Sequence, residues 1–396
     1  MIPVELDVVE PLGRLIARPW ADAVTGLQID SRRIAEGDLF VAVDGGADFV
    51  EHALARGAGA ALVPHDAHAA LATVAGTVRE RSNARVVAIT GSTGKTSTKD
   101  ILYAICAPQA KTIANEGNYN NELGVPLTLA RLEQDTQVCI AELGMRGLGQ
   151  IAYLASFTKP DVGVITNVGP VHLELVETIE NVARAKAELL AALPAGGVAV
   201  IPDEPLLAPH LDRTDITVER VDPDAPLPFA TSYSARHQLA NTRFAVAAAR
   251  HLGIALPDHE LHVEFSKLRE EERELPGGGL LLNDCYNANP ISMRAALEHL
   301  SERANGRRRV ALLGEMAELG DGAPAYHEEI GALVRELGIE HVIAVGGLAR
   351  AYGGEWVADA GGATERLREA LRPGDVVLVK GSRSVGLEVV AENITA

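Results

Sequence analysis

Two long stretches of the chain alternate short apolar runs with helix-like segments, and this alternation limits the fold more than any other feature. In the first stretch the apolar runs are VVAIT, QVCIAEL, DVGVITNV and GVAVI, at 86–90, 137–143, 161–168 and 197–201. In the second they are GLLLNDCY, RVALLGEM, HVIAVGG and DVVLVKGS, at 279–286, 309–316, 341–347 and 375–382. Continuous β-branched runs of this length are typical of parallel strands buried on both faces. The sequence therefore predicts an α/β protein with two doubly wound sheets.

A shorter first unit precedes these stretches. It contains the strand-like runs GDLFVAV (37–43) and AALVP (60–64), and the polar segment RERSNAR (79–85) follows it as a linker. A chain of 396 residues is too long for one ordinary core. We therefore expect three domains, at 1–84, 85–255 and 256–396.

Charge and composition exclude several classes of protein. A net charge of −18 disfavours nucleic-acid binding, which needs a basic surface, but still permits a small anion held by local cations. No run of eighteen apolar residues and no secretory signal pattern occur, which predicts a protein without a membrane span. The three cysteines lie far apart and form no C-x-x-C pair, as expected in the reducing cytoplasm.

The segment TGSTGKTS (90–97) lies between an apolar run and a helical pattern. The usual phosphate-loop pattern would place a glycine at 89, where this chain has Ile89, but the Gly-Lys-Thr half is present. Glycines let backbone N–H groups surround a phosphate at a helix N-terminus, while Lys95 would lie along the phosphates and the Thr96 hydroxyl would complete a Mg²⁺ shell. The alternative is an ordinary capped turn. We expect ATP or GTP to bind here, at Gly91, Ser92, Thr93, Gly94, Lys95, Thr96 and Ser97.

Two residues near the ends of the following strands and one on a helical segment are candidates for metal and catalytic roles. Glu142 ends the run QVCIAEL and can hold Mg²⁺; its alternative is a solvated acid. His172 follows TNVGPV, where a lone histidine can equally be structural. Lys186, in ARAKAELL, reads on pattern alone as a solvent-facing lysine of an amphipathic helix.

Three polar stretches complete the candidates. IANEGNYNNELGVPLT (113–128) is rich in amides that bind substrate oxygens or cap loops. DCYNANP (284–290) follows a buried strand, where polar residues indicate a ligand, although an Asx turn before a helix is the alternative. KGSRS (380–384) offers Lys380 and Arg383 to a carboxylate or phosphate.

Taken together and in this order, these segments resemble the Mur ligase family, the ATP-dependent amide-bond-forming enzymes of peptidoglycan synthesis. Within it they are most similar to the MurF type, which adds D-alanyl-D-alanine to UDP-N-acetylmuramoyl-tripeptide. The segments that carry the resemblance are DSRRIAEGDLFVAV (30–43), TGSTGKTS (90–97), GNYNNELGVPLT (117–128), AELGMRGLGQIA (141–152), TNVGPVHLE (166–174), ARAKAELL (183–190), DCYNANPISM (284–293), LGEMAELG (313–320) with His327, and VLVKGSRS (377–384).

The resemblance implies an N-terminal UDP-sugar-binding domain, a central P-loop ATPase sheet and a C-terminal Rossmann-like domain for the incoming amino acid or dipeptide. It implies catalytic roles for Lys95, His172 and Lys186, and Mg²⁺ ligation by Thr96, Glu142, His172 and a carbamylated Lys186. It places Asn241, Asp284, Tyr286 and Asn287 at ATP. It places Asp30, Ser31, Arg32, Asn120, Asn121, Lys380, Ser382 and Arg383 at the other substrates. Arg269 and Arg273 are both candidates for an arginine expected before the first strand of the third domain.

The implied activity is ATP-dependent ligation through an acyl phosphate, with ATP and Mg²⁺ as cofactors and UDP-N-acetylmuramoyl-peptide and D-Ala-D-Ala as partners, in a cytoplasmic monomer. The turn after residue 43 and the segment between 205 and 235 are shorter than is usual in the family. A related ligase with a different acceptor is therefore the first alternative. A nucleotide-binding homologue without catalysis is the second, and the intact set of candidate residues speaks against it.

Overall fold

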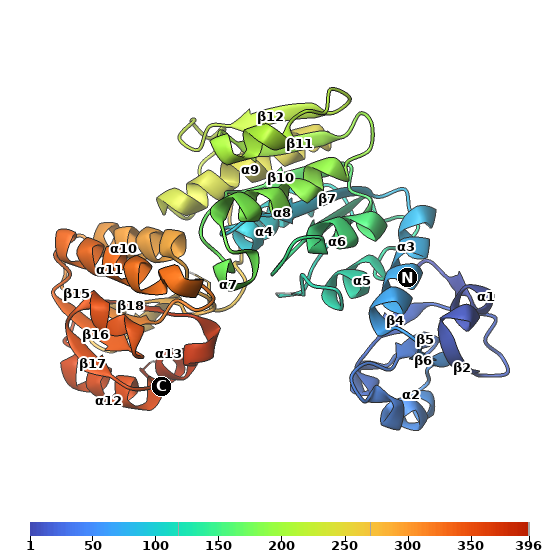
Figure 1. Ribbon diagram of the computed structural model, residues 1–396, viewed down its shortest axis with the longest axis horizontal. Coiled ribbons are helices and arrows are strands. Elements are labelled where there is room, and N and C mark those ends of the chain that lie inside the picture. Colours follow the sequence, from blue (N-terminus) through green and yellow to red (C-terminus); the bar gives the residue numbers. More distant parts are fainter. Residues whose placement is uncertain (118, 270, 395–396) are drawn as a thin grey trace.

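The computed structural model describes residues 1–117, 119–269 and 271–394. It consists of three consecutive α/β parts, each built around its own sheet (Figure 1). The central part, in green and yellow, lies between the other two, and the blue N-terminal part and the orange and red C-terminal part extend from opposite ends of it. Within the described ranges, no helix is both long and apolar enough to cross a membrane.

The N-terminal part has a four-stranded sheet of order β2-β6-β5-β4. Only β2 runs antiparallel to its neighbour. The strands are β2 (Gly13–Ala17), β4 (Gly26–Gln28), β5 (Asp38–Val41) and β6 (Ala60–Pro64), with a small β1 (Val4–Glu5) and β3 (Ala23–Val24) pair beside them. The helices are α1 (Leu6–Val9), α2 (Val50–Ala55) and α3 (Ala67–Arg81).

The central part has six parallel strands in the order β12-β11-β10-β7-β9-β8. They are β7 (Arg85–Thr90), β8 (Thr112–Ala114), β9 (Val138–Glu142), β10 (Val162–Ile165), β11 (Val198–Pro202) and β12 (Thr217–Val221). Successive residues of β7 enter opposite cores: Val87 and Ile89 pack with helices α4 (Lys95–Cys106) and α9 (Arg236–His251), whereas Val86 and Ala88 pack toward the other face. That second face is covered by α5 (Gly124–Leu129), α6 (Gln150–Thr158) and α8 (Ile179–Ala191). A short α7 (Leu173–Val176) precedes α8.

The C-terminal part has a second six-stranded sheet, of order β13-β14-β18-β15-β16-β17, in which only the edge strand β13 is antiparallel. Its strands are β13 (Glu271–Leu275), β14 (Gly279–Asp284), β15 (Arg309–Gly314), β16 (His341–Val345), β17 (Glu355–Val357) and β18 (Val376–Lys380). Helices α10 (Pro290–Ala304) and α11 (Ala323–Glu336) cover one face, and α12 (Ala360–Ala370) and α13 (Glu388–Ile394) cover the other.

The predicted α/β class with two doubly wound sheets is confirmed, and every apolar run named in the two stretches is a strand. Two strands of the central sheet, β8 and β12, were not predicted. Helix α3 packs against α5 and α6, so the N-terminal and central parts share one hydrophobic core. The limits of the three domains stay a prediction.

Candidate functional site

The loop between β7 and α4 needs glycine at two positions because neighbouring side chains lie where a Cβ would be. At Gly91, with φ of 152°, an added Cβ would lie 1.9 Å from Thr166 Oγ1. At Gly94, with φ of 75°, it would lie 2.4 Å from Oδ1 of Asn241 on α9. The loop is therefore held closely between the end of β10 and helix α9.

The N-terminus of α4 is open to a ligand. Gly94 is its N-cap residue, and no side chain caps the helix. The first amides of an α-helix lack intrahelical acceptors, and with the helix dipole they form an anion site. Asn167 Oδ1 accepts hydrogen bonds from the amides of Ser92 (3.1 Å) and Thr93 (2.9 Å), which fixes the preceding turn. The resulting geometry is that of a phosphate-binding loop.

Two lysines with lowered pKa values interact electrostatically near this loop. Lys95 Nζ donates to the Gly91 carbonyl at 2.8 Å, and burial lowers the pKa of Lys95. Lys186 on α8 is 1% exposed, and burial, reinforced by the charge of Lys95, lowers its pKa well below the usual value. The reading of Lys186 as a solvent-facing lysine is therefore wrong. Among the described residues no carboxylate forms an ion pair with it.

Glu142 at the end of β9 is completely buried and faces the first turn of α4. Thr96 Oγ1 donates to its Oε2 at 2.9 Å, and Asn120 Nδ2 donates to its Oε1 at 2.7 Å. A hydroxyl and a carboxylate are donors that Mg²⁺ accepts, and Mg²⁺ commonly completes its shell with phosphate oxygens and water. In the described ranges no cluster of three or more His, Cys, Asp and Glu residues gathers as a self-sufficient metal site. The donor set thus fits a metal that arrives with a nucleotide.

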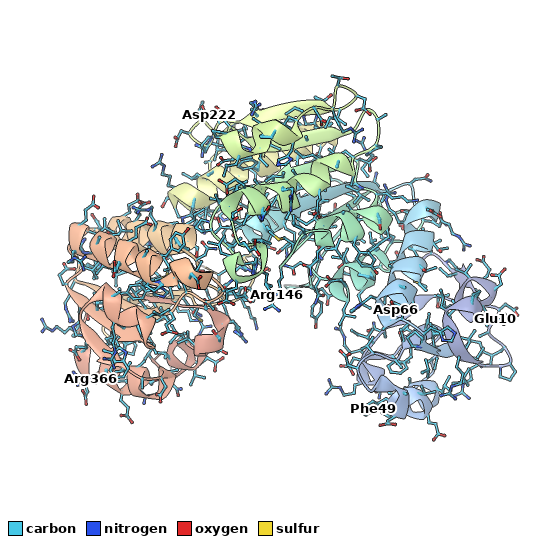
Figure 2. The ribbon with its side chains drawn as sticks, in the orientation of Figure 1. Glu10, Phe49, Asp66, Arg146, Asp222 and Arg366 are labelled. Carbon is cyan, nitrogen blue, oxygen red and sulfur yellow. The ribbon has the colours of Figure 1, made fainter. Side chains whose placement is uncertain are left out.

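His172, the N-cap residue of α7, contacts the C-terminal part. Its Nδ1 lies 2.5 Å from Oε2 of Glu318, and Arg146 Nη2 lies 2.5 Å from Oε1 of the same carboxylate. Figure 2 shows Arg146 on the side of the central part that faces the other two parts. Burial lowers the pKa of His172, and the Glu318 charge opposes this shift only in part. A carboxylate oxygen can only accept, so Nδ1 of His172 is the donor in this contact.

The largest set of candidate residues meets in one cavity of about 350 Å³ between the carboxyl ends of the two six-stranded sheets. Its predicted lining residues are Ser92, Thr93, Gly94, Lys95, Thr96, Ser97, Asn241, Asp284, Asn287 and Lys380. Lys380 Nζ forms an ion pair with Asp284 Oδ2 at 2.5 Å and donates to the Asn287 carbonyl at 3.0 Å. Arg269 also lines the cavity, whereas Arg273 pairs with Glu271 in β13. Of the two candidate arginines, Arg269 is the one at the site.

Two further cavities hold most of the remaining candidates. Next to the loop, a cavity of about 310 Å³ is lined by Lys95, His172, Tyr286, Ser382 and Arg383 among others. In the N-terminal part, a cavity of about 590 Å³ is lined by Asp30, Ser31, Arg32 and Asn121. Gly91, Asn120, Glu142 and Lys186 line none of these three cavities.

Sequence reasoning missed several residues of the central cavity. The motif TNVGPVHLE contains Thr166 and Asn167 but predicts no separate role for either, and the sequence predicts no role for His237 and Phe244 on α9. For Thr166 and Asn167 a signal existed, because polar residues directly after a buried parallel strand lie at the ligand-binding edge of the sheet. For His237 and Phe244 the helical pattern offered none.

Comparison with known proteins agrees with this geometry. A family model of the Mur ligase middle domain matches residues 89–227, and one described as "Mur ligase, glutamate ligase domain" matches residues 269–383. Curated relatives named UDP-N-acetylmuramoyl-tripeptide–D-alanyl-D-alanine ligase, from Escherichia coli K12 and Mycobacterium tuberculosis H37Rv, are each 33% identical to this chain. The alignments cover 93% and 94% of this chain and 92% of each relative.

Solved structures agree over the same length. MurF from Acinetobacter baumannii superposes with a TM-score of 0.85 at 26% identity, covering 99% of both chains. MurF from Thermotoga maritima in complex with ADP gives 0.81 at 26% identity, covering 94% of this chain and 97% of the other. A chain that follows these ligases along nearly its whole length, with a phosphate-binding loop where they have the middle domain, belongs to the Mur ligase family.

Proposed function

We propose that this chain joins D-alanyl-D-alanine to UDP-N-acetylmuramoyl-tripeptide at the expense of ATP, in peptidoglycan synthesis. One observation carries the proposal: the uncapped N-terminus of α4 with Lys95 opens into a cavity that Asp284, Arg269 and Lys380 of the C-terminal part also line. A phosphate site shared by two sheets suits an enzyme that binds a nucleotide in one part and an acceptor in another. The relatives that carry this name, which the alignments cover almost completely, support the choice of substrates.

ATP would occupy the central cavity. Its phosphates would contact the amides of residues 93–97 and the Lys95 ammonium group. The nucleoside would lie between α9 and α10, where Asn241 and Phe244 line the same cavity as the loop. Arg269 lies over the ring of Tyr286, with 4.1 Å between Cζ and the ring centroid, and so closes the C-terminal side.

Mg²⁺ fits at Thr96 and Glu142, whose oxygens already converge. His172 and Lys186 are the candidates for a second ion. When bound, Mg²⁺ supplies positive charge that neutralises phosphate oxygens. The hydrogen bond from Asn120 keeps the Glu142 carboxylate turned toward Thr96.

Lys186 fits a role as a carbamate. In the reaction, its neutral amine adds to the carbon of CO₂ and loses one proton, which yields an anionic carboxylate-like group. Burial lowers the pKa of Lys186 well below its usual value and so favours the neutral amine, which is the nucleophilic form. The negative product would also attract the Lys95 ammonium group.

The chemistry has two steps. First, the terminal carboxylate of the UDP-linked peptide attacks the γ-phosphorus of ATP; an acyl C–O–P linkage forms, the bond to the bridging oxygen breaks, and ADP leaves. Second, the neutral amine of D-Ala-D-Ala attacks the acyl carbon; the C–N bond forms, phosphate leaves, and the amine nitrogen releases a proton. Lys95 stabilises the charge on the transferred phosphoryl group.

Water must be excluded from the acyl phosphate, because hydrolysis would waste the ATP. Asp30, Ser31 and Arg32 line a cavity in the N-terminal part, whereas Ser382 and Arg383 line one beside the phosphate loop. The N-terminal and C-terminal parts extend away from each other in Figure 1. We therefore expect closure of the parts around the bound substrates before reaction.

Phosphate release tests the proposal. Purified protein is incubated with ATP, Mg²⁺ and UDP-N-acetylmuramoyl-tripeptide, and D-Ala-D-Ala is compared with single amino acids and other dipeptides. We expect release that requires both substrates and is fastest with D-Ala-D-Ala. A clear preference for another acceptor would favour the related-ligase alternative, and no release with any acceptor would favour the inactive homologue. Size-exclusion chromatography of the same sample tests the expected monomer.

A further inference from the structure

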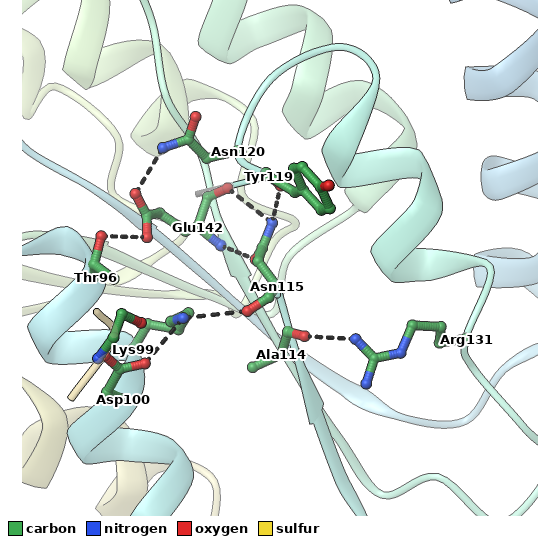
Figure 3. Close-up of polar contacts among 10 residues, drawn as sticks. Thr96, Lys99, Asp100, Ala114, Asn115, Tyr119, Asn120, Arg131 and Glu142 are labelled. Carbon is green, nitrogen blue, oxygen red and sulfur yellow. Dashed lines mark hydrogen bonds and ion pairs between the residues drawn. The ribbon is translucent and has the colours of Figure 1, made fainter. Parts of the chain in front are cut away.

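Asn115 lies where the outer strand of the central sheet stops short of Glu142. The last residue pair between β8 and β9 is Ala114 with Ile140. Glu142, two residues further along β9, pairs with Ile89 of β7 on its inner side but, among the residues that the structure describes, has no strand partner on the outer side. Asn115 follows β8 directly, is 4% exposed, and fills this position (Figure 3).

The carboxamide of Asn115 takes the place of the missing strand. Its Oδ1 accepts a hydrogen bond from the Glu142 amide at 2.6 Å, and its Nδ2 lies 3.5 Å from the Glu142 carbonyl. The same Nδ2 donates to the Tyr119 carbonyl at 2.5 Å. Both ends of one buried side chain are therefore engaged, one with the strand and one with the loop that follows.

These contacts orient the Glu142 side chain from two directions. The strand contact fixes the backbone from which the carboxylate extends toward Thr96. The contact with the Tyr119 carbonyl fixes the residue next to Asn120. The side-chain Nδ2 of Asn120 donates to the same Glu142 carboxylate. Figure 3 shows the hydrogen bonds of Asn115 with Glu142 and Tyr119, and the hydrogen bond from Asn120 to the Glu142 carboxylate.

Asn115 is itself anchored through its main chain. Lys99 Nζ donates to the Asn115 carbonyl at 3.1 Å and forms a buried ion pair with Asp100 at 2.9 Å. The other oxygen of Asp100 accepts a hydrogen bond from the amide of Ser266, which precedes the C-terminal sheet. Asn115 therefore joins the Glu142 strand to helix α4 as well as to the loop.

We infer that Asn115 is a positioning residue that holds the Glu142 carboxylate and the Asn120 loop in the geometry for Mg²⁺ with the nucleotide. The inference rests on the proposed function for the identity of the metal and nucleotide. Asparagine suits the position because it presents one acceptor and one donor. Aspartate would replace Nδ2 with an oxygen that faces the carbonyl oxygens of Tyr119 and Glu142. Alanine would leave the buried backbone amide of Glu142 without its hydrogen-bond acceptor.

The test compares Asn115→Asp and Asn115→Ala with the native protein in measurements that need no turnover. Calorimetry gives the affinity of Mg²⁺ for the ADP complex and the affinity of ADP in the presence of EDTA. Hydrogen exchange in the ligand-free protein reports on the segments that contain Glu142 and Asn120. Because second-shell changes typically cost metal sites 10- to 100-fold, we expect Mg²⁺ affinity to fall by about 10-fold or more. ADP affinity in EDTA should change less than about twofold, and exchange in both segments should become faster.

Asn181→Asp is the matched control, because Asn181 Nδ2 also donates to a backbone carbonyl, that of Val176, at 2.8 Å. It should leave Mg²⁺ affinity unchanged. A folded Asn115 variant with a lower melting temperature but native Mg²⁺ affinity would overturn the inference, since that is the result of a purely structural role. The alanine variant keeps the test decisive if the aspartate variant does not fold. Failure of D-Ala-D-Ala to serve as acceptor would overturn only the proposed function, because these measurements use ADP and Mg²⁺ alone.

Discussion

Glu318, in the loop after β15 of the C-terminal sheet, accepts a hydrogen bond from His172 of the central part, with 2.5 Å between Oε2 and Nδ1. The carboxylate fixes the ring tautomer, because a carboxylate can only accept and Nδ1 must then donate. Burial raises the pKa of Glu318, but the His172 and Arg146 contacts outweigh it and the net pKa is lowered. One side chain of the C-terminal part therefore orients a candidate metal ligand of the central part.

We expect Glu318→Gln to lower kcat roughly 10-fold or more, because the ring loses the anion that orients it. Steady-state phosphate release measures the effect. Arg146→Ala is the comparison: the Arg146 side chain is 68% exposed, and exposed ion pairs contribute little. Equal losses in the two variants would contradict the role assigned to the His172 contact.

Lys95→Ala should reduce turnover by roughly 100-fold or more, because it removes a cation aimed at the developing charge. Folding should be intact, since Lys95 lines the ligand cavity and is held there by a hydrogen bond to the Gly91 carbonyl. Circular dichroism and phosphate release check the two halves of this expectation. Lys111→Ala, at a surface lysine paired with Glu133 and Asp135, should leave turnover near native. Substantial residual activity in the Lys95 variant would refute its role.

Lys186→Met should separate stability from activity. Methionine has a similar length and removes a buried amine that has no ion-pair partner among the described residues, so the melting temperature should stay the same or rise. Activity should fall roughly 10- to 100-fold, as expected on loss of a group that holds a metal. Arg184→Met, at an exposed position of the same helix, should change neither quantity.

Short carboxylic acids test the carbamate directly. Added acetate or formate should restore part of the activity of Lys186→Ala, because the acid supplies the missing anion. It should have no effect on Arg184→Met. Absence of rescue, together with an unmodified Lys186 in the native protein by mass spectrometry, would leave Lys186 as a buried neutral amine.

Much of this architecture is readable from the sequence, since buried parallel strands are continuous apolar runs. The strands that escaped prediction are edge strands with few buried residues. In β8 only Ile113 is buried, and in β12 only Val221, so neither strand produces such a run. The sequence does contain a signal for the burial of Lys186, because it is spaced with apolar residues along one face of α8. The residues of this face, all buried, are Ala183, Lys186, Ala187 and Leu190.

The site is less predictable than the fold because its contacts join distant segments. The sequence indicates that Glu142 ends a strand, but it does not indicate that Asn115 completes the sheet beside it. The partnership of Glu318 with His172 spans 146 residues and two sheets. Such pairings depend on strand order, which the sequence left open.

The buried ion pair of Lys99 and Asp100 should contribute strongly to stability. Their side chains are 4% and 11% exposed, and removing one partner of such a pair leaves a charge uncompensated. We expect Asp100→Ala to lower the free energy of unfolding by about 3 kcal/mol, as measured by urea denaturation. The double variant Lys99→Met with Asp100→Ala should recover much of this loss. If it is no more stable than Asp100→Ala alone, the loss comes from the Ser266 contact instead.

His327 on α11 should make stability depend on pH. It is fully buried and stacks on Tyr352; its Nε2 accepts from the Met316 amide at 3.0 Å, and its Nδ1 donates to the Ala323 carbonyl at 2.7 Å. Burial lowers its pKa below the ordinary value of 6.5, so as the pH falls below 6.5 the unfolded chain takes up the proton first. The stability contributed by neutral His327 is therefore complete above pH 6.5 and is lost as the pH falls toward the folded-state pKa.

The measurement for His327 is urea unfolding at pH 7.5 and pH 5.5. Each unit between the unfolded and folded pKa is worth about 1.4 kcal/mol, and His327→Gln removes this contribution while its amide oxygen can accept from Met316. The variant should lose less stability than the native protein between the two pH values. His172 and His341 also have lowered pKa values and titrate in both proteins, so only the difference between the two reports on His327. An identical pH dependence would mean that the buried ring accepts a proton in the folded state as readily as in the unfolded chain.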